Sequence, residues 1–220
     1  MDALILLGLV VVVALDGASV GQFMISRPLV AGSLAGWIVG SPEGGLTIGL
    51  ILELLQLPFF QIGGARVSEG GLGAVVGAAV LSSNAGPGGV ALGVLLGLVM
   101  ANVGGWTVEW LHRFQGVAAP RDHDGRLNPA EVTAFHWRSL ARDAARGAVV
   151  GAFGLLLARL LGGPAAEGWL LDAPHTRLVL LAAGSFSLGA FFHNLGTGAR
   201  SVGALLAGLA VGLFLTGVLG

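Results

Sequence analysis

Two polar residues stand close together in the otherwise apolar stretch TIGLILELLQLPFF. Glu53 and Gln56 are three residues apart, so on a helix they share a face. Two glycines lie on the same face, one and two turns before Glu53, and would keep it open. A carboxylate accepts hydrogen bonds from neighbouring hydroxyl groups, and an amide both donates and accepts. The pattern therefore predicts a surface suited to a polyhydroxylated ligand such as a sugar.

The position of Glu53 in an apolar segment also has a structural interpretation. An acidic residue at membrane depth costs roughly 2.5–3.5 kcal/mol on insertion scales, so it normally faces a cavity or a partner. The alternative to a binding role is a structural Glu53 that is protonated or paired with Arg27 or Arg66.

A second group of polar residues lies in the stretch DGASVGQFMISRP, directly after the first apolar run. Gly17 and Gly21 allow the chain to break there, and Pro28 starts the next helix. Because the residue before a proline is biased away from the helical region, Arg27 is expected on extended backbone. We predict that Arg27 forms an ion pair with an embedded acid, Glu53 or Asp16 first.

The composition indicates an integral membrane protein. The 220 residues are 55% hydrophobic and only 10% charged, well below the usual share of charged residues in soluble domains, about 25%. A formal net charge of −1 without a basic patch argues against binding of nucleic acid. The chain has no cysteine, which excludes disulfides and thiolate chemistry. No metal site or cofactor is expected.

The apolar segments are short for membrane spans. Crossing about 30 Å of hydrocarbon takes about 20 helical residues, and several of these segments are shorter and interrupted by Gly, Pro or polar residues. This is typical of discontinuous helices beside a wet cavity. We expect an all-helical polytopic membrane protein with short, discontinuous transmembrane helices and re-entrant hairpins. The segments are residues 3–15, 28–40, 44–60, 70–81, 88–106, 147–163, 178–192 and 201–220.

One long polar interval divides the chain. We expect a single membrane domain, residues 1–220, with an N-terminal block at 1–110, a polar connector at 111–146 and a C-terminal block at 147–220. The connector is rich in arginine, so the positive-inside bias places it in the cytoplasm. Within it, Asn128 and Pro129 predict a helix start. We expect an amphipathic helix on the membrane surface, before the chain re-enters at Gly147. Its arginines Arg138, Arg142 and Arg146 would bind lipid headgroups or a cytoplasmic protein.

Glycines at four-residue spacing predict close helix packing. Gly32, Gly36 and Gly40 form a triple row, which is the most persuasive case. Shorter rows are the pairs Gly45 and Gly49, Gly73 and Gly77, Gly93 and Gly97, and Gly147 and Gly151.

The N-terminal block carries a family resemblance. It rests on the block QFMISRPLVAG, the turn GWIVGSPEGGLTIG, the glutamate in LELL and the loop QIGGA, all within residues 15–65. This stretch resembles the N-terminal signature of the IIC membrane subunit of the mannose/fructose/sorbose family of the bacterial sugar phosphotransferase system.

The resemblance implies a permease subunit of the bacterial cytoplasmic membrane that is not an enzyme by itself. It would bind a hexose and pass it to a phosphorylated IIB partner for phosphorylation on entry. Its partners would be a IID membrane subunit and cytoplasmic IIA and IIB phosphocarriers, in a hetero-oligomer among membrane lipids. The substrate contacts carried over from the family are Glu53, Gln61, Gly63, Gly64 and Ala65, with Asp16 and Gln22 as weaker candidates. Gln56 is added because its spacing from Glu53 places both residues on one helix face.

Two alternatives stay open from the sequence. Where the family usually has a Pro-acid pair after the glycine loop, this chain reads RVSEG, which suits a non-transporting membrane scaffold of an incomplete, regulatory phosphotransferase system. The other alternative is an intramembrane hydrolase that uses His193 with a glutamate, although no second metal ligand at helical spacing and no hydrolase motif accompanies His193.

Overall fold

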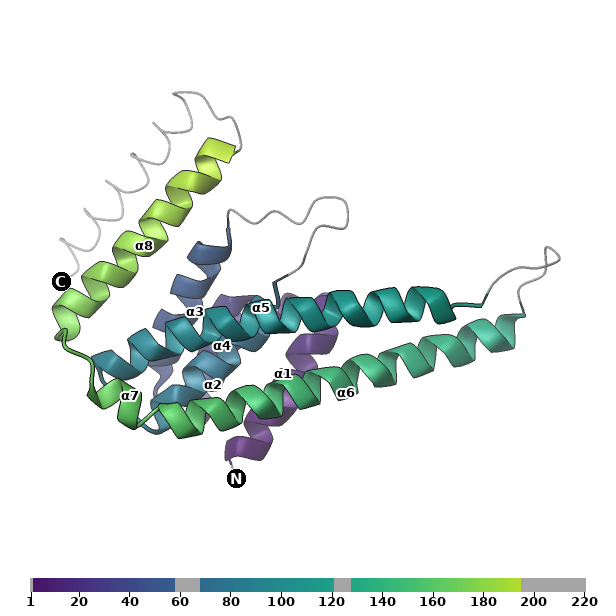
Figure 1. Ribbon diagram of the computed structural model, residues 1–220, viewed down its shortest axis with the longest axis horizontal. Helices are drawn as coiled ribbons and strands as arrows, with labels where there is room; N and C mark the ends of the chain where they lie inside the picture. The colour runs from purple at the N-terminus through teal and green to yellow at the C-terminus, as the bar shows by residue number, and fades with distance from the viewer. Residues whose placement is uncertain (1, 58–67, 121–127, 195–220) are drawn as a thin grey trace.

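The protein is an assembly of helices, as expected for its class (Figure 1). The computed structural model describes residues 2–57, 68–120 and 128–194, and no strand occurs in these ranges. In chain order the elements are α1 (Asp2–Ala18), α2 (Pro28–Ile38), α3 (Pro42–Gln56), α4 (Gly70–Ala79), the 3₁₀ turn η1 (Val80–Ser82), α5 (Pro87–Ala118), α6 (Pro129–Leu161), α7 (Pro164–Glu167) and α8 (Ala173–Asn194).

Helix starts follow the local sequence closely. Proline occupies the first turn of α2, α3, α5, α6 and α7, where its missing N–H costs no hydrogen bond. Asn128 caps α6 as expected, because its side chain accepts a hydrogen bond from the backbone N–H of Ala130 at 3.0 Å. Asp172 accepts one from the backbone N–H of His175 at the start of α8. This bond, together with a side-chain bond to His175, lowers the pKa of Asp172.

Three of the described helices are long and apolar enough to cross a membrane. They are Pro87–Ala118, Pro129–Leu161 and the stretch Ala173–Phe192 of α8. Shorter apolar helices at Pro28–Ile38 and Gly70–Ser82 lie among them. The combination of full-length and short apolar helices confirms the expected polytopic membrane fold.

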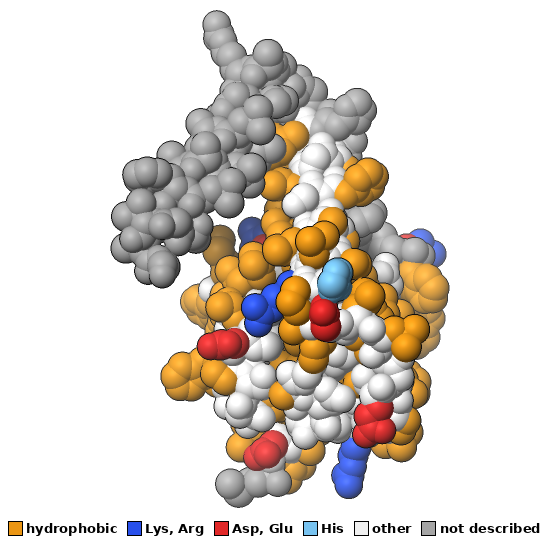
Figure 2. All heavy atoms as spheres, turned by 90° about the vertical axis from the view of Figure 1, so that its left-hand side faces the viewer, with side chains coloured by type: hydrophobic (Ala, Val, Ile, Leu, Met, Phe, Trp, Pro, Cys, Tyr) orange, Lys and Arg blue, Asp and Glu red, His pale blue; other side chains and the backbone are white. Residues whose placement is uncertain are grey.

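Two of the long helices extend beyond any bilayer core. At 1.5 Å per residue, α5 with 32 residues and α6 with 33 are each about 50 Å long, against a hydrocarbon core of about 30 Å. Figure 1 shows the C-terminal end of α5 and the N-terminal end of α6 projecting together, past the other helices. We call the two projecting ends the stalk, formed by residues 109–118 of α5 and 129–142 of α6. The opposite end, at α7, carries charged side chains among hydrophobic ones (Figure 2).

The path of the chain at Gly147 differs from the expectation. The sequence predicted a surface helix that stops before Gly147, but α6 runs without a break from Pro129 to Leu161. No proline interrupts it, and Gly147 packs against α1, where an added Cβ would lie 2.8 Å from the Cβ of Ala14. Arg146, which was expected to bind lipid headgroups or a cytoplasmic protein, is instead paired with acidic side chains inside the protein. The apolar segment 88–106 is likewise part of a longer helix.

The glycine rows pair with one another across helix interfaces. The row of α2 faces the row of α3: a Cβ added at Gly32 would lie 2.8 Å from the carbonyl oxygen of Gly45. The same arrangement joins α4 to α5, where a Cβ added at Gly97 would lie 2.9 Å from the carbonyl oxygen of Gly73. Backbones approach this closely only where side chains are missing. The shorter rows therefore lie at close helix interfaces, as the triple row does. Gly40, the last member of the triple row, has open space around its Cβ position.

Stability should depend on these contacts and not on glycine content as such. We expect Gly45→Ala to lower the thermal unfolding midpoint of the purified protein, because overpacking a close interface costs about 1–3 kcal/mol. Gly8→Ala is the matched control, since nothing lies within 4 Å of a Cβ at Gly8 and alanine favours a helix. Equal midpoints for the two variants would contradict the packing argument.

Candidate functional site

A cavity of about 600 Å³ opens where the short helices meet. Its walls come from α1, the linker at residues 19–27, the start of α2, the end of α3 and the start of α4, with single residues from α5 and α8. A volume of this size is typical of small-molecule sites, about 300–1,000 Å³. The polar side chains of its lining are Ser26, Arg27, Glu53, Gln56, Ser68 and Glu69.

Glu53 combines the two roles that the sequence left as alternatives. Its Oε1 lies 2.8 Å from a terminal nitrogen of Arg27, and its Oε2 accepts a hydrogen bond from the backbone N–H of Leu29 at 3.3 Å. Arg27 sits on extended backbone before Pro28, as expected, with φ −66° and ψ 132°. Glu53 is also part of the cavity wall, and its side chain stays 20% exposed. A structural ion pair and a position at the cavity are therefore compatible.

Gln56 lies one helical turn from Glu53 and lines the same cavity. Its Nε2 is buried and has no hydrogen-bond partner among the described protein atoms. Its Oε1 lies against Gly70, where any Cβ would collide with it. Buried polar groups are nearly always hydrogen-bonded, so an orphaned donor calls for a ligand or an ordered water. Gln56 is the clearest sign in the described structure that this cavity holds something polar.

The weaker sequence candidates lie elsewhere. Asp16 is buried beside the linker, and its two carboxylate oxygens accept hydrogen bonds from the backbone N–H groups of Phe23 at 2.6 Å and Ser26 at 2.8 Å. Gln22 is exposed on the linker with φ 53°. Neither residue belongs to the cavity lining. Asp16 shapes the linker that forms one cavity wall, because it satisfies backbone donors that no helix satisfies.

The loop candidates Gln61, Gly63, Gly64 and Ala65 lie outside the described residues. The two described residues that flank this interval, Leu57 and Ser68, both line the cavity.

Sequence reasoning missed Glu69 as part of the site. Glu69 lines the cavity at the start of α4, and its carboxylate forms a two-pronged ion pair with Arg146 of α6, at 2.6 and 2.7 Å. A usable signal was present in the sequence: each of the two residues is the last charge before an apolar segment. Their separation of 77 positions gave no hint that they meet.

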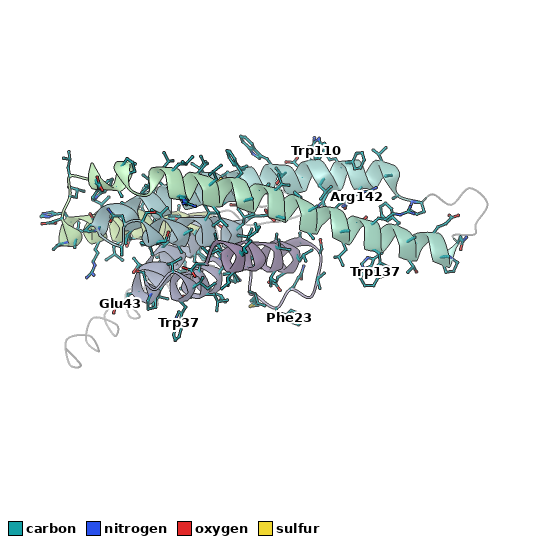
Figure 3. All side chains as sticks on the ribbon, turned by 90° about the horizontal axis from the view of Figure 1, so that it is seen from below. Phe23, Trp37, Glu43, Trp110, Trp137 and Arg142 are labelled. Atoms are coloured by element: carbon teal, nitrogen blue, oxygen red, sulfur yellow. The ribbon has the colours of Figure 1, made fainter. Side chains whose placement is uncertain are left out.

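The three arginines of the connector separate into two groups. Arg138 and Arg142 are exposed on the stalk, and the guanidinium carbon of Arg142 lies 5.6 Å from the ring centre of Phe114 on α5. Arg146 does not share this exposed face, because its side chain is only 7% exposed and is held by acids. In Figure 3, Trp110 and Trp137 point to opposite sides of the helix pair near Arg142. Exposed tryptophans beside charged residues are typical of a membrane–water boundary.

His193 lies in the last turn of α8, and its side chain is outside the described part of the structure. The hydrolase alternative therefore gains no support from the described residues.

Comparison with known proteins matches the sequence to one family. The family model described as the PTS system sorbose-specific IIC component matches residues 2–184. The PTS system sorbose-specific EIIC component of Lacticaseibacillus casei is 29% identical over 121 residues, 55% of this chain and 43% of that protein. The mannose-specific EIIC component of Escherichia coli K12 is 27% identical over 134 residues, 61% of this chain and 49% of that protein. The chain thus spans about half the length of the curated relatives it matches.

The fold also has a counterpart among solved structures. A chain titled "Structure of membrane protein" superposes with a TM-score of 0.71 at 19% identity, over 100% of this chain and 91% of that chain. At this identity the likeness shows the fold alone.

The orphaned amide of Gln56 leads to a prediction about stability. We expect Gln56→Met to leave the thermal unfolding midpoint unchanged or to raise it, because burial of an unsatisfied donor costs about 1–3 kcal/mol. Gln115→Met is the matched control: its Nε2 donates to the backbone carbonyl of Ser139 at 3.2 Å, so its loss should lower the midpoint. A clear drop for Gln56→Met without ligand would mean that its amide is already satisfied.

Proposed function

This chain belongs to the family of the PTS sorbose-specific IIC component, and we propose that it binds a hexose-type sugar in the cavity beside Glu53. The sugar would then pass to a phosphorylated IIB partner and be phosphorylated on entry. The chain itself would contribute no catalytic residue. It would supply the binding site and the path across the bacterial cytoplasmic membrane.

The pairing of Glu53 with Gln56 in one cavity carries the proposal. A carboxylate has about four acceptor positions, and the described contacts of Glu53 use two of them. The remaining positions suit sugar hydroxyls as donors. The buried Nε2 of Gln56 has an N–H to offer to a hydroxyl oxygen. A site with unpaired acceptors and one orphaned donor matches a ligand whose hydroxyl groups both donate and accept hydrogen bonds.

The charge of the cavity wall favours a neutral ligand. Its three charged side chains are each held in an ion pair: Arg27 with Glu53, and Glu69 with Arg146 behind the wall. An anionic ligand would have to compete with Glu53 for Arg27 and would face the carboxylate of Glu69. A neutral sugar adds hydrogen bonds to these groups without separating them.

The family and the exposed stalk together suggest the partners. We expect a IID membrane subunit beside the helices and cytoplasmic IIA and IIB phosphocarriers, in a hetero-oligomer. The positive-inside bias places the stalk, with Arg113, Arg138 and Arg142, on the cytoplasmic side. Its exposed arginines would then be available to lipid headgroups or to a phosphocarrier.

The stalk also favours a second candidate function. A membrane scaffold of a regulatory phosphotransferase system would recruit a phosphocarrier through Arg138 and Arg142 without transporting sugar. The two functions differ in what they require: transport needs the cavity, whereas recruitment needs only the exposed arginines.

Transport is tested by Glu53→Gln in cells that carry the partner subunits. Gln keeps an oxygen that can accept from Arg27, so insertion and folding should persist, while sugar uptake should fall at least about tenfold because charged hydrogen bonds are lost. Glu43→Gln, an exposed position on the same helix, is the control and should not change uptake. Normal uptake by Glu53→Gln would overturn the proposed site.

Recruitment is tested by the double variant Arg138→Ala and Arg142→Ala. If the stalk binds a phosphocarrier, co-purification of that protein with the membrane subunit should be lost, because the exposed positive charges are removed. Arg159→Ala, an exposed arginine at the other end of α6, serves as the control. Unchanged recruitment would count against the scaffold function.

A further inference from the structure

Three helices meet at the guanidinium of Arg146, and the linker between α1 and α2 joins them through Asp143. Its Nε lies 2.8 Å from Asp143 on the same helix, and its two terminal nitrogens contact Glu69 at the start of α4. One of these nitrogens also lies 3.1 Å from the hydroxyl of Thr107 on α5. Asp143 accepts a further hydrogen bond from Ser19, in the linker between α1 and α2. One side chain thus joins α6 to α4, to α5 and, through Asp143, to the linker.

This cluster is buried and well satisfied. The side chains of Arg146, Glu69 and Asp143 are 7%, 8% and 2% exposed. A buried charge is tolerated only when its partners are complete, and removal of one partner costs about as much as several ordinary hydrogen bonds. The forked guanidinium matches the two oxygens of Glu69, a geometry that lysine cannot reproduce. The cluster therefore holds the carboxylate of Glu69 in one position as well as neutralising its charge.

The packing around Glu69 leaves little freedom for another position. The backbone N–H of Glu69 donates to the carbonyl oxygen of Ala101 at 3.0 Å. Gly104 lies directly beneath its side chain, where an added Cβ would be 2.5 Å from Oε2 of Glu69. Arg146 holds the carboxylate from the other helix. The side chain is thus held between α5 and α6 at one definite place.

That place is the wall of the cavity. Ser68, Glu69, Gly70 and Gly71 are consecutive lining residues, whereas Arg146 is not part of the lining. We propose that Arg146 is a positioning residue: it holds Glu69, and with it the start of α4, in the geometry that the cavity needs to bind its sugar. That Arg146 holds Glu69 and the start of α4 in place follows from the contacts given above. That this geometry serves the binding of a sugar rests on the proposed function.

The carboxylate of Glu69 keeps acceptor positions for a ligand. Arg146 occupies one position on each oxygen, and a carboxylate offers about four. The two remaining acceptor positions belong to Glu69, which lines the cavity. Arg146 therefore orients Glu69 as an acceptor for a sugar hydroxyl while its own side chain stays behind the wall.

The first experiment tests the wall without any sugar. The chain has no cysteine, so Ser68→Cys introduces a single thiol into the cavity lining. In the full chain reconstituted in lipid nanodiscs, we expect Arg146→Lys to change the rate at which a water-soluble thiol reagent labels this position by at least about threefold. Lysine keeps the positive charge but cannot form the two parallel hydrogen bonds of the guanidinium. Ser83→Cys, an exposed position at the opposite end, should label at the same rate with and without Arg146→Lys.

The second experiment tests whether Arg146 acts through Glu69. We expect Arg146→Lys to weaken binding of D-mannose or L-sorbose to the same nanodiscs by about tenfold, roughly the loss of one good hydrogen bond. Glu69→Gln should weaken it similarly. In the double variant the two losses should not multiply, because both remove the same interaction. Arg159→Lys, an exposed arginine on the same helix, is the control and should leave both labelling and binding unchanged.

The outcomes separate this inference from the proposed function. Unchanged labelling with Arg146→Lys overturns the positioning role, whatever the sugar data show. Altered labelling with no binding of either sugar by the unmodified chain contradicts the proposed function but supports the positioned wall. Altered labelling with losses that multiply in the double variant shows that Arg146 does not act through Glu69, which overturns the inference as stated.

Discussion

A charge that is buried inside a membrane protein needs a partner there, and this constraint shapes the described structure most clearly around Arg146 and Asp16. Arg27 meets Glu53, Arg146 meets Glu69 and Asp143, and Asp16 meets two backbone N–H groups. The pairs Arg27–Glu53 and Arg146–Glu69 join segments that are distant in the chain, and Asp16 closes the break between α1 and α2. Asp143 supports Arg146 from the same helix. Because an unpaired charge in a medium of low dielectric is so costly, these pairs restrict the ways in which the helices can be assembled.

The glycine rows bring helices close enough for the ion pair Arg27–Glu53 to form. An ion pair forms only if two backbones come close enough for both side chains to reach. The α2–α3 and α4–α5 contacts are backbone to backbone, with Gly45 against Gly32 and Gly97 against Gly73. With α2 and α3 in contact, Arg27 at the start of one helix reaches Glu53 near the end of the other. Small residues and charged residues thus depend on each other in this fold.

The cavity is a consequence of the same arrangement. Its three charged side chains already hold helices together, and the carboxylates of Glu53 and Glu69 keep acceptor positions after their structural contacts are made. Gln56 is the exception, because its amide nitrogen is buried without a protein partner. A site built in this way is pre-organised, so a ligand does not have to order its side chains on binding. Among the polar side chains that line the cavity, this amide nitrogen is the buried atom that the described protein contacts leave unsatisfied.

The sequence by itself determined the class, the helix starts and several of the polar residues that matter. Composition indicated a membrane protein, prolines and Asn128 marked helix starts, and the spacing of Glu53 and Gln56 placed both on one face, because these features depend on local chemistry. It grouped Arg146 with Arg138 and Arg142 on an exposed docking face, because the three recur every four residues, whereas Arg146 is buried against acidic partners. Only the tertiary structure decided that α6 continues through Gly147, that Glu69 lines the cavity, and that Asp16 supports a linker. Pairs such as Glu69 and Arg146 are set by the packing of distant helices, and no local pattern in the chain encodes that packing.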